Sequence, residues 1–434
     1  RDLGIALNSA TKGIINLEKE STVGMYVDNA LGENKSIINV KKGNSAGMYG
    51  SSDSKITNAL KINISNEKSA GMYALDSEAI NTKDGKIKVD GNSGATGGSA
   101  GMYGKLTSNA KKDYTILNEG KIILNSELKN VGIYGETDKN VNHTLTLKNK
   151  KLIKINNGSK QSVGIFAVND NTNDKDKLLV VNTEDGKIIA DSKESIGISA
   201  EKSKVENSGT ISLGGGNSAG IAVIEEGGSA IRAYTNSVKN TGTGTINVGA
   251  GESIGMYLKL GEADKIINDG IINVNAGSSV GMRVDRGALA SNGNPIADNN
   301  KDIKVTAGEG SMGMVALGNG TAGTAIANNN SGAKITLAGN KNVGMHAQNG
   351  GKINNASSIT GGGTTLIGMQ IYDNNSEGNH SGTISLAGAG STGVYNNGGG
   401  KFTMTDGSIT TSGGNTTGVF SNGGTNTTIE KGTI

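Results

Sequence analysis

The sequence predicts an all-β protein, a right-handed parallel β-helix of about sixteen coils with lateral loop insertions. One observation is a short unit that recurs along the whole chain, in which an apolar or small residue, Gly and Met or Ile are often followed by Tyr. Another is a short alternating strand that precedes most of these units at a fixed distance. The third is composition, because 70 Gly, one Pro, no Trp and 3% aromatic residues suit a narrow core of repeated Ile, Val, Ala, Leu and Met.

The recurring unit is read most easily in residues 46–49, Ala-Gly-Met-Tyr. Its spacing averages about 28 residues, within the range of stacked structural repeats. No segment has the apolar period of a long helix, and the repeats are too short for the four-stranded blades of a propeller. The glycines of the unit are Gly4, Gly24, Gly47, Gly71, Gly101, Gly132, Gly164, Gly197, Gly220, Gly255, Gly281, Gly313, Gly344, Gly368, Gly393 and Gly418.

The preceding strand alternates apolar and polar residues, as in residues 85–89, Gly-Lys-Ile-Lys-Val. Seven residues separate Val40 from Gly47, and most other coils repeat this spacing, which predicts a fixed turn. The return from the glycine to the next such strand varies from 14 residues to 26, so a second corner accepts insertions. Asparagines before the next turn glycine are expected to adopt unusual backbone angles and to stack their amides between coils: Asn118, Asn207, Asn240 and Asn268.

Strand alternation places Ala46 and Met48 on the inner face and Tyr49 on the outer face. If the glycine marks a bend, alternation fails there and the tyrosine turns inward. Otherwise the Tyr position forms an outward row over six successive coils, lapses at Ser199 and Ala222, and returns at Tyr257. This row is the candidate ligand-binding site, because exposed rings stack on sugars or anchor protein partners: Tyr26, Tyr49, Tyr73, Tyr103, Tyr134 and Phe166. The alternative is that the rings only stack on one another or lie under the insertions.

Long return loops are a second candidate for binding, since loops on a rigid scaffold commonly carry function. These loops span residues 135–151, 167–186, 223–243 and 285–302, and the alternative is that they are tolerated surface insertions.

The residues give no support for catalysis, a metal or a cofactor. The two G-x-G-x-x-G matches, 308–313 and 388–393, fall at the fixed corner of the repeat and precede a strand, whereas a dinucleotide site needs a helix. His143, His346 and His380 are scattered and expected on the surface or in loops, His346 as an exposed variant of the Tyr row. Acidic residues gather in turns and insertions: Asp170, Asp174, Asp176, Glu225 and Glu226. Zero Cys excludes thiolate chemistry, and a net charge of +3 gives no nucleic-acid footprint.

Charge density changes along the chain. Residues 1–217 carry 29 Lys+Arg and 25 Asp+Glu, against 13 and 14 in residues 218–434, where Gly, Ser and Asn replace charge. We interpret this as a drift along one β-helix segment, 1–434. No signal peptide and no membrane-length apolar run is present, so we expect a segment of a longer chain whose export signal and anchor lie outside it.

The Gly-Met-Tyr units alternating with Asn-x-Gly-x-Ile-x-Val strands resemble the passenger domains of large fusobacterial autotransporter adhesins. The resemblance covers essentially all 434 residues. It implies type Va secretion, a C-terminal membrane β-barrel missing from this chain, display on the outer membrane and a role in virulence. It also implies co-aggregation with partner bacteria, or binding of host-cell surface proteins or glycans, by a monomeric rod.

Three functions therefore remain open. The segment is an adhesin that binds through its aromatic row or loops, or a stalk that projects a binding tip located elsewhere. A β-helical carbohydrate-active enzyme is the distant third, because such enzymes align carboxylates on one face.

Overall fold

The computed structural model describes residues 5–8, 13–91, 98–125, 129–171, 175–224, 238–260, 265–286, 294–306 and 309–434. The chain divides into two compact units, Arg1–Ser218 (unit 1) and Ala219–Ile434 (unit 2). Within the described residues the regular structure is β-strand apart from one turn of 3-10 helix, η1 (Lys175–Lys177). The described part of the chain has no helix long and apolar enough to cross a membrane.

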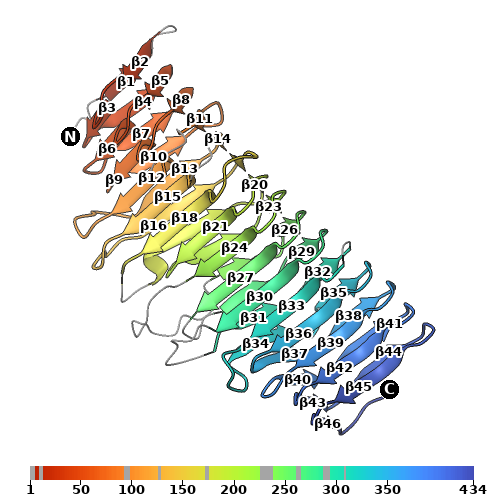
Figure 1. Ribbon diagram of the computed structural model, residues 1–434. Helices are drawn as coiled ribbons and strands as arrows, with labels where there is room; N and C mark the ends of the chain where they lie inside the picture. The colour runs from red at the N-terminus through yellow and green to blue at the C-terminus, as the bar shows by residue number, and fades with distance from the viewer. Residues whose placement is uncertain are drawn as a thin grey trace. The chain divides into compact units, whose positions relative to one another are not determined.

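Unit 1 has three parallel sheets, A, B and C, whose strands lie side by side in the order given (Figure 1). Sheet A contains β1 (Ile5–Asn8), β4 (Leu31–Asn34), β7 (Lys55–Asn58), β10 (Glu78–Asn81), β13 (Tyr114–Asn118), β16 (Leu145–Asn149), β19 (Leu178–Asn182) and β22 (Lys204–Asn207). Sheet B contains β2 (Ile14–Leu17), β5 (Ile37–Val40), β8 (Lys61–Ile64), β11 (Lys86–Val89), β14 (Lys121–Leu124), β17 (Leu152–Ile155), β20 (Lys187–Ala190) and β23 (Thr210–Leu213). Sheet C contains β3 (Val23–Asp28), β6 (Ala46–Ser51), β9 (Ala70–Leu75), β12 (Ala100–Leu106), β15 (Val131–Thr137), β18 (Val163–Asn169) and β21 (Ile196–Glu201).

Unit 2 repeats the same three sheets. Sheet A contains β25 (Val238–Asn240), β28 (Lys265–Asn268), β31 (Ile296–Asn299), β34 (Ala325–Asn329), β37 (Gly351–Asn355), β40 (Glu377–His380), β43 (Lys401–Met404) and β46 (Asn426–Ile429). Sheet B contains β26 (Thr245–Val248), β29 (Ile271–Val274), β32 (Asp302–Val305), β35 (Lys334–Leu337), β38 (Ser358–Gly361), β41 (Thr383–Leu386) and β44 (Ser408–Thr411). Sheet C contains β24 (Ala219–Ile224), β27 (Ile254–Leu260), β30 (Val280–Arg286), β33 (Met312–Leu317), β36 (Val343–Gln348), β39 (Ile367–Tyr372), β42 (Thr392–Asn397) and β45 (Thr417–Asn422).

This topology confirms the right-handed parallel β-helix. The chain passes from sheet B to C to A and back to B, so each strand pairs in parallel with the strand three places further on. Coils stack in register because identical residue types meet, as where Ile87 of β11 pairs with Ile62 of β8 and Ile122 of β14. All three isoleucines are fully buried, and burying such a side chain contributes about 1.5–3 kcal/mol.

A buried asparagine row holds the corner between sheets A and B. Within each unit the amide N–H of one asparagine donates to the amide oxygen of the next at 2.7–2.9 Å. The predicted stacking is confirmed, but the predicted backbone angles are wrong, because each asparagine ends a sheet A strand in extended conformation. The row comprises Asn34, Asn58, Asn81, Asn118, Asn149, Asn182 and Asn207 in unit 1, and Asn240, Asn268, Asn299, Asn329 and Asn355 in unit 2.

The fixed seven-residue connection is the corner between sheets B and C. A residue with positive φ turns the chain there, as at Ser21 (56°), Asn44 (53°) and Lys68 (51°). The next residue is usually Ser or Thr, and its hydroxyl accepts a hydrogen bond from the previous coil, as from the Ser45 N–H to Ser69 Oγ at 3.2 Å. Both features recur from coil to coil, which explains the constant length.

Sheet C shows why the repeat needs glycine. A Cβ on Gly101 would lie 2.7 Å from the carbonyl oxygen of Gly132 in the next coil, and one on Gly132 would lie 2.5 Å from that of Gly164. The backbones approach too closely there for any side chain. The register of β9 and β12 pairs Ala70 with Ala100 and Met72 with Met102, but leaves out the glycines between them.

The glycine also interrupts strand alternation, which corrects the face assignment. In β15 both Gly132 and Ile133 are buried, while Val131 and Tyr134 are partly exposed. The tyrosine therefore faces outward as expected, and Met48 lies in the core, but Ala46 shares the outer face with Tyr49 rather than the inner face with Met48. The bend turns the side chain before the glycine outward, while the two side chains after the glycine keep the directions that alternation predicts.

Two histidine predictions are wrong. His346 occupies the Tyr position of β36, as predicted, but only 9% of it is exposed because Gln348 and Gln370 flank its ring. His380 is fully buried and continues the asparagine row, with its Nδ1 3.1 Å from the amide nitrogen of Asn355. His143 is partly exposed beside Asp113.

Candidate functional site

The six predicted site residues form one continuous row on the outer face of sheet C in unit 1, and we call them the aromatic row. They are Tyr26, Tyr49, Tyr73, Tyr103, Tyr134 and Phe166, and each pairs in register with the next. Tyr26 is 62% exposed and the other five are partly exposed. The next residue in register is Ser199, so the row ends there as the sequence indicates.

The rings contact one another in two arrangements. Tyr26, Tyr49 and Tyr73 are nearly parallel, with centroids 5.4 and 5.0 Å apart, and this separation means that they are offset and only partly overlap. From Tyr73 onward each ring turns 69–82° from the one before, at 4.5–5.5 Å. The rings therefore stack on one another, which is the alternative to ligand binding that the sequence left open. Each such pair of rings contributes about 0.5–1.5 kcal/mol to stability. Every ring of the row nevertheless keeps part of its surface exposed.

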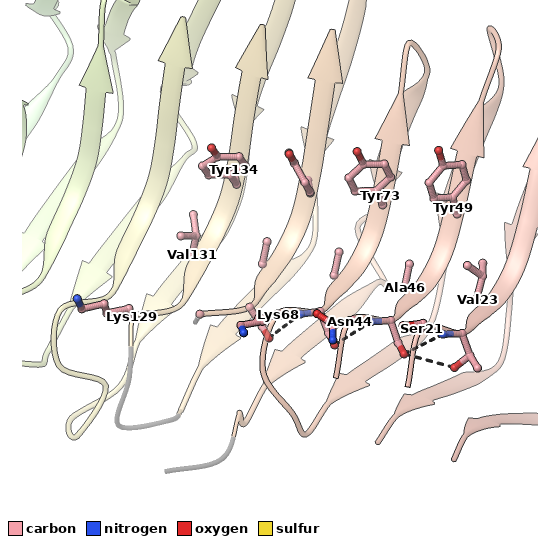
Figure 2. Close-up of a pocket in the computed structure, with 18 of the residues that line it drawn as sticks. Ser21, Val23, Asn44, Ala46, Tyr49, Lys68, Tyr73, Lys129, Val131 and Tyr134 are labelled. Atoms are coloured by element: carbon pink, nitrogen blue, oxygen red, sulfur yellow. Dashed lines mark hydrogen bonds between the residues drawn. The ribbon is translucent and has the colours of Figure 1, made fainter. Parts of the chain in front are cut away.

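A groove of about 730 Å³ runs beside the aromatic row. Its floor is the row of residues three places before each ring, Val23, Ala46, Ala70, Ala100 and Val131 (the floor row). Figure 2 shows three parallel lines of side chains across the strands, with Tyr49, Tyr73 and Tyr134 on one side and Val23, Ala46 and Val131 in the middle. The far side is the corner between sheets B and C. The lining residues two places before each floor residue are what we call the rim row: Ser21, Asn44, Lys68, Gly98 and Lys129.

The sequence analysis did not find the floor and rim rows. Their signal was present, since small Ala or Val residues precede each glycine and the rim residues precede the Ser or Thr of the fixed corner. Strict alternation placed the floor row inside the core and so concealed it. The groove exists because the small residues of the floor row lie beside the large rings of the aromatic row.

Charged residues lie on the opposite side of the aromatic row. Lys105 Nζ lies 2.9 Å from Glu136 Oε1, and the Tyr134 hydroxyl donates to Glu136 Oε2 at 3.0 Å. Burial opposes ionisation of Glu136, but the hydrogen bonds from Lys105, Tyr103 and Tyr134 outweigh it and hold its pKa below the ordinary value. Burial, together with the Glu136 carboxylate, raises the pKa of Tyr103 and Tyr134, so both hydroxyls remain neutral donors.

The lining of the groove is suited to binding rather than to proton transfer. Among the residues that the structure describes, the lining includes Lys68 and Lys129 but no Asp, Glu or His. General acid–base catalysis of glycoside cleavage needs a pair of carboxyl groups at the bond. Among the described residues no cluster of His, Asp or Glu could hold a metal ion.

The same positions in unit 2 carry mixed residues. Where unit 1 has rings, unit 2 has Ala222, Tyr257, Arg283, Val315, His346, Gln370, Tyr395 and Phe420. Asp285 accepts two hydrogen bonds from the Arg283 guanidinium at 2.8 and 2.9 Å and one from the Tyr257 hydroxyl at 2.9 Å. Tyr395 and Phe420 stack at 5.0 Å.

The predicted long loops lie between sheets C and A. Loop 135–151 is described, and in it β15 ends at Thr137 and β16 begins at Leu145. Loops 167–186, 223–243 and 285–302 extend outside the described residues, as do Asp174, Glu225 and Glu226, so their part in a site stays a prediction.

Part of the chain is similar to a known protein family. Residues 105–295 match the model of the BigA third pectate lyase-like domain. The match begins after Tyr103, so it includes Tyr134 and Phe166 but not the first four rings. A comparison with curated proteins gives no match. The family match and the fold together support a β-helical, surface-exposed bacterial protein.

Proposed function

We propose that this chain is a segment of a bacterial surface adhesin and that the groove of unit 1 contacts the partner, a host-cell surface protein or glycan or the surface of another bacterium. The observation that carries the proposal is the aromatic row, five of whose six rings are partly exposed and line a groove of about 730 Å³. A monomeric soluble protein rarely leaves a long apolar surface uncovered unless it binds something there. Display at the outer membrane through type Va secretion belongs to the same proposal.

A non-catalytic role fits the groove better than the enzyme that a pectate lyase-like domain brings to mind. Ring edges, alanine methyl groups and serine hydroxyls can hold a ligand, and no carboxylate or imidazole is found among the described residues of the lining. The charged groups nearby, Lys105 and Glu136, are paired with each other.

A purely structural stalk is the second candidate. The ring contacts along the aromatic row favour it, because stacked rings stabilise successive coils whether or not a ligand is present. A stalk, however, gives no reason for an alanine floor beside the rings.

The test is binding of the whole 434-residue chain to a panel of host cells and partner bacteria. Replacing Tyr49, Tyr73 and Tyr103 with Ser, the residue found at position 199, removes the centre of the aromatic row. The matched control replaces Tyr395 and Phe420 in unit 2 with Ser, because these rings also stack at the same strand position.

The proposal predicts saturable binding that the unit 1 variant loses and the unit 2 variant keeps, with an unchanged β-sheet circular dichroism signal in both. An intact chain that binds no surface in the panel, or a unit 1 variant that binds as well as the wild type, would support the stalk instead.

A further inference from the structure

The groove crosses the strands instead of following them. Its lining comes from equivalent positions of β3, β6, β9, β12, β15 and β18, so any ligand lying in it meets one coil after another. Successive coils are about 4.8 Å apart. A polymer that fits such a groove must therefore repeat its contacts at about this interval.

This interval fits a chain of β-linked sugars better than a peptide. One pyranose ring with its linkage is close in length to one coil. An extended peptide presents side chains on the same face about 6.6 Å apart, which falls out of step with the coils. The floor methyl groups of Ala46, Ala70 and Ala100, with the ring edges beside them, match the apolar C–H faces of sugars.

The rim row adds a charge pattern. Lys68 and Lys129 are exposed and are the charged residues in the described part of the groove lining, whereas Ser21, Asn44 and Gly98 are neutral. Lys68 precedes β9 and Lys129 precedes β15, so the two lie two coils apart, about 10 Å. Because two coils correspond to two sugars, the two lysines lie beside every second sugar of such a polymer.

No carboxylate of the described residues lines the groove, so none cancels this positive charge from within it. Asp76 accepts hydrogen bonds from the Thr107 backbone and hydroxyl at 2.7 and 2.5 Å, and Glu136 is paired with Lys105. Both lie beyond the aromatic row. Glu67 is next to Lys68 in the chain but does not line the groove.

The coil spacing, the alanines of the floor row, the aromatic row and the spacing of the two lysines all match one class of ligand. We infer that the groove binds an unbranched, β-linked acidic polysaccharide with a carboxylate on every second sugar. The inference rests on the proposed adhesin function and specifies its ligand. The polymer lies across sheet C with its carboxylates toward the rim row and its C–H faces on the floor and the rings.

The test measures affinity of the whole chain, by calorimetry, for purified oligosaccharides of equal length. Hyaluronan oligosaccharide alternates glucuronate with N-acetylglucosamine and supplies the inferred pattern. Chitin oligosaccharide supplies a neutral β-linked chain, oligogalacturonate a carboxylate on every sugar, and oligoglutamate an acidic peptide. The inference predicts that hyaluronan oligosaccharide binds most tightly and that its affinity falls as salt rises.

Two double variants separate charge from fold. Lys68→Gln with Lys129→Gln removes both rim cations, and the affinity for hyaluronan oligosaccharide should fall about tenfold, since each partly exposed ion contact contributes about threefold. Lys42→Gln with Lys193→Gln changes exposed lysines of equivalent corners that do not line the groove, and it should bind as the wild type does.

Several outcomes would overturn the inference while leaving the adhesin proposal intact. One such outcome is that the neutral chitin chain binds as tightly as hyaluronan oligosaccharide, and another is that oligogalacturonate or oligoglutamate binds more tightly. A third is that the Lys68/Lys129 variant keeps full affinity for hyaluronan oligosaccharide. In each case the ring variant still loses cell binding. The adhesin proposal itself fails if the intact chain binds no surface in the panel, or if the ring variant binds cells normally. Cell binding that protease treatment of the cells abolishes, but hyaluronidase does not, would identify a protein partner and contradict the polysaccharide.

Discussion

The two units share one scaffold but differ in the size of side chains at two surface positions. Unit 1 places rings next to a floor of Val23, Ala46, Ala70 and Ala100. From β27 to β39 the floor positions of unit 2 have larger residues, and several ring positions have small or polar ones. These floor residues are Ile254, Val280, Met312, Val343 and Ile367, whereas the other strands of sheet C in unit 2 have Ala219, Thr392 and Thr417. Small floor residues beside large rings make the groove of unit 1, whereas the larger floor residues from β27 to β39 fill the same space in unit 2.

The buried rows, in contrast, are common to both units. The glycine row of sheet C, the asparagine row and the positive-φ corner recur in each. The coil is therefore determined by the buried rows, while the outer rows are free to differ. Changes in the shared rows should damage both units alike, whereas changes in the outer rows should affect binding in unit 1.

The largest effect is expected at the shared glycines. Gly132→Val in unit 1 and Gly344→Val in unit 2 each place a side chain 2.5 Å from the carbonyl oxygen of the next coil. Both should lower the free energy of unfolding by about 3 kcal/mol or more, measured by urea denaturation. Gly414→Ala meets no atom within 4 Å and should be nearly neutral. A mild effect at either buried glycine would contradict the close-approach explanation.

A smaller loss is expected in the asparagine row. Asn149→Leu leaves the Asn118 amide without its acceptor and the Asn182 amide oxygen without its donor, so the free energy of unfolding should fall by about 2 kcal/mol. Asn299→Leu should do the same in unit 2. Asn39 stacks in the same way with Asn16 and Asn63 but on the outer face of sheet B, and Asn39→Leu should cost under about 0.5 kcal/mol. Equal losses at Asn149 and Asn39 would show that burial does not set the cost.

These rows also show how far the sequence could lead. Period-2 strands and the constant seven-residue spacing predict the coil, and the Tyr row is visible because its members recur after each glycine. The groove could not be predicted, because alternation across Gly47 puts Ala46 inside unless the bend is known. The interior position of His380 was also hidden, since a single histidine at the end of an asparagine row carries no repeat signal of its own.

An intermediate effect is expected on binding when the floor of unit 1 is made like that of unit 2. Ala70→Ile with Ala100→Ile should fill the groove and weaken binding to the partner surface about tenfold, a loss of about 1.4 kcal/mol. Stability should change little, because the new side chains lie on the outer face. Binding is measured on the cell surface that the wild type recognises, with circular dichroism as the control. Unchanged affinity would mean that the groove is not the contact.

The smallest effect is a pH dependence confined to unit 2. Burial lowers the pKa of His346 and His380 below the ordinary value of about 6.5, and unit 1 has only the partly exposed His143. The unfolded chain then binds protons more readily, so stability is complete above the unfolded pKa and falls as the pH drops below it. Protonation of His380 at Nδ1 would also place an N–H donor against the amide nitrogen of Asn355, which is itself a donor.

Hydrogen exchange near pH 7 and about pH 5, corrected for the intrinsic exchange rate, should show a loss of protection in unit 2 at the lower pH. His380→Asn extends the asparagine row and should reduce that loss. Equal acid sensitivity of the two units would contradict the assignment to the buried histidines.

A partner that lies in the groove of unit 1 would shield the groove floor from a thiol reagent, and a single thiol can be introduced there because the chain has no Cys of its own. Ala100→Cys places a single thiol on the groove floor, and Thr392→Cys places one at the equivalent position of unit 2, where the side chain is also partly exposed. Labelling rates are compared with and without the partner surface. The account predicts that the partner slows labelling at position 100 and leaves position 392 unchanged. Equal rates at position 100 with and without the bound partner would contradict it.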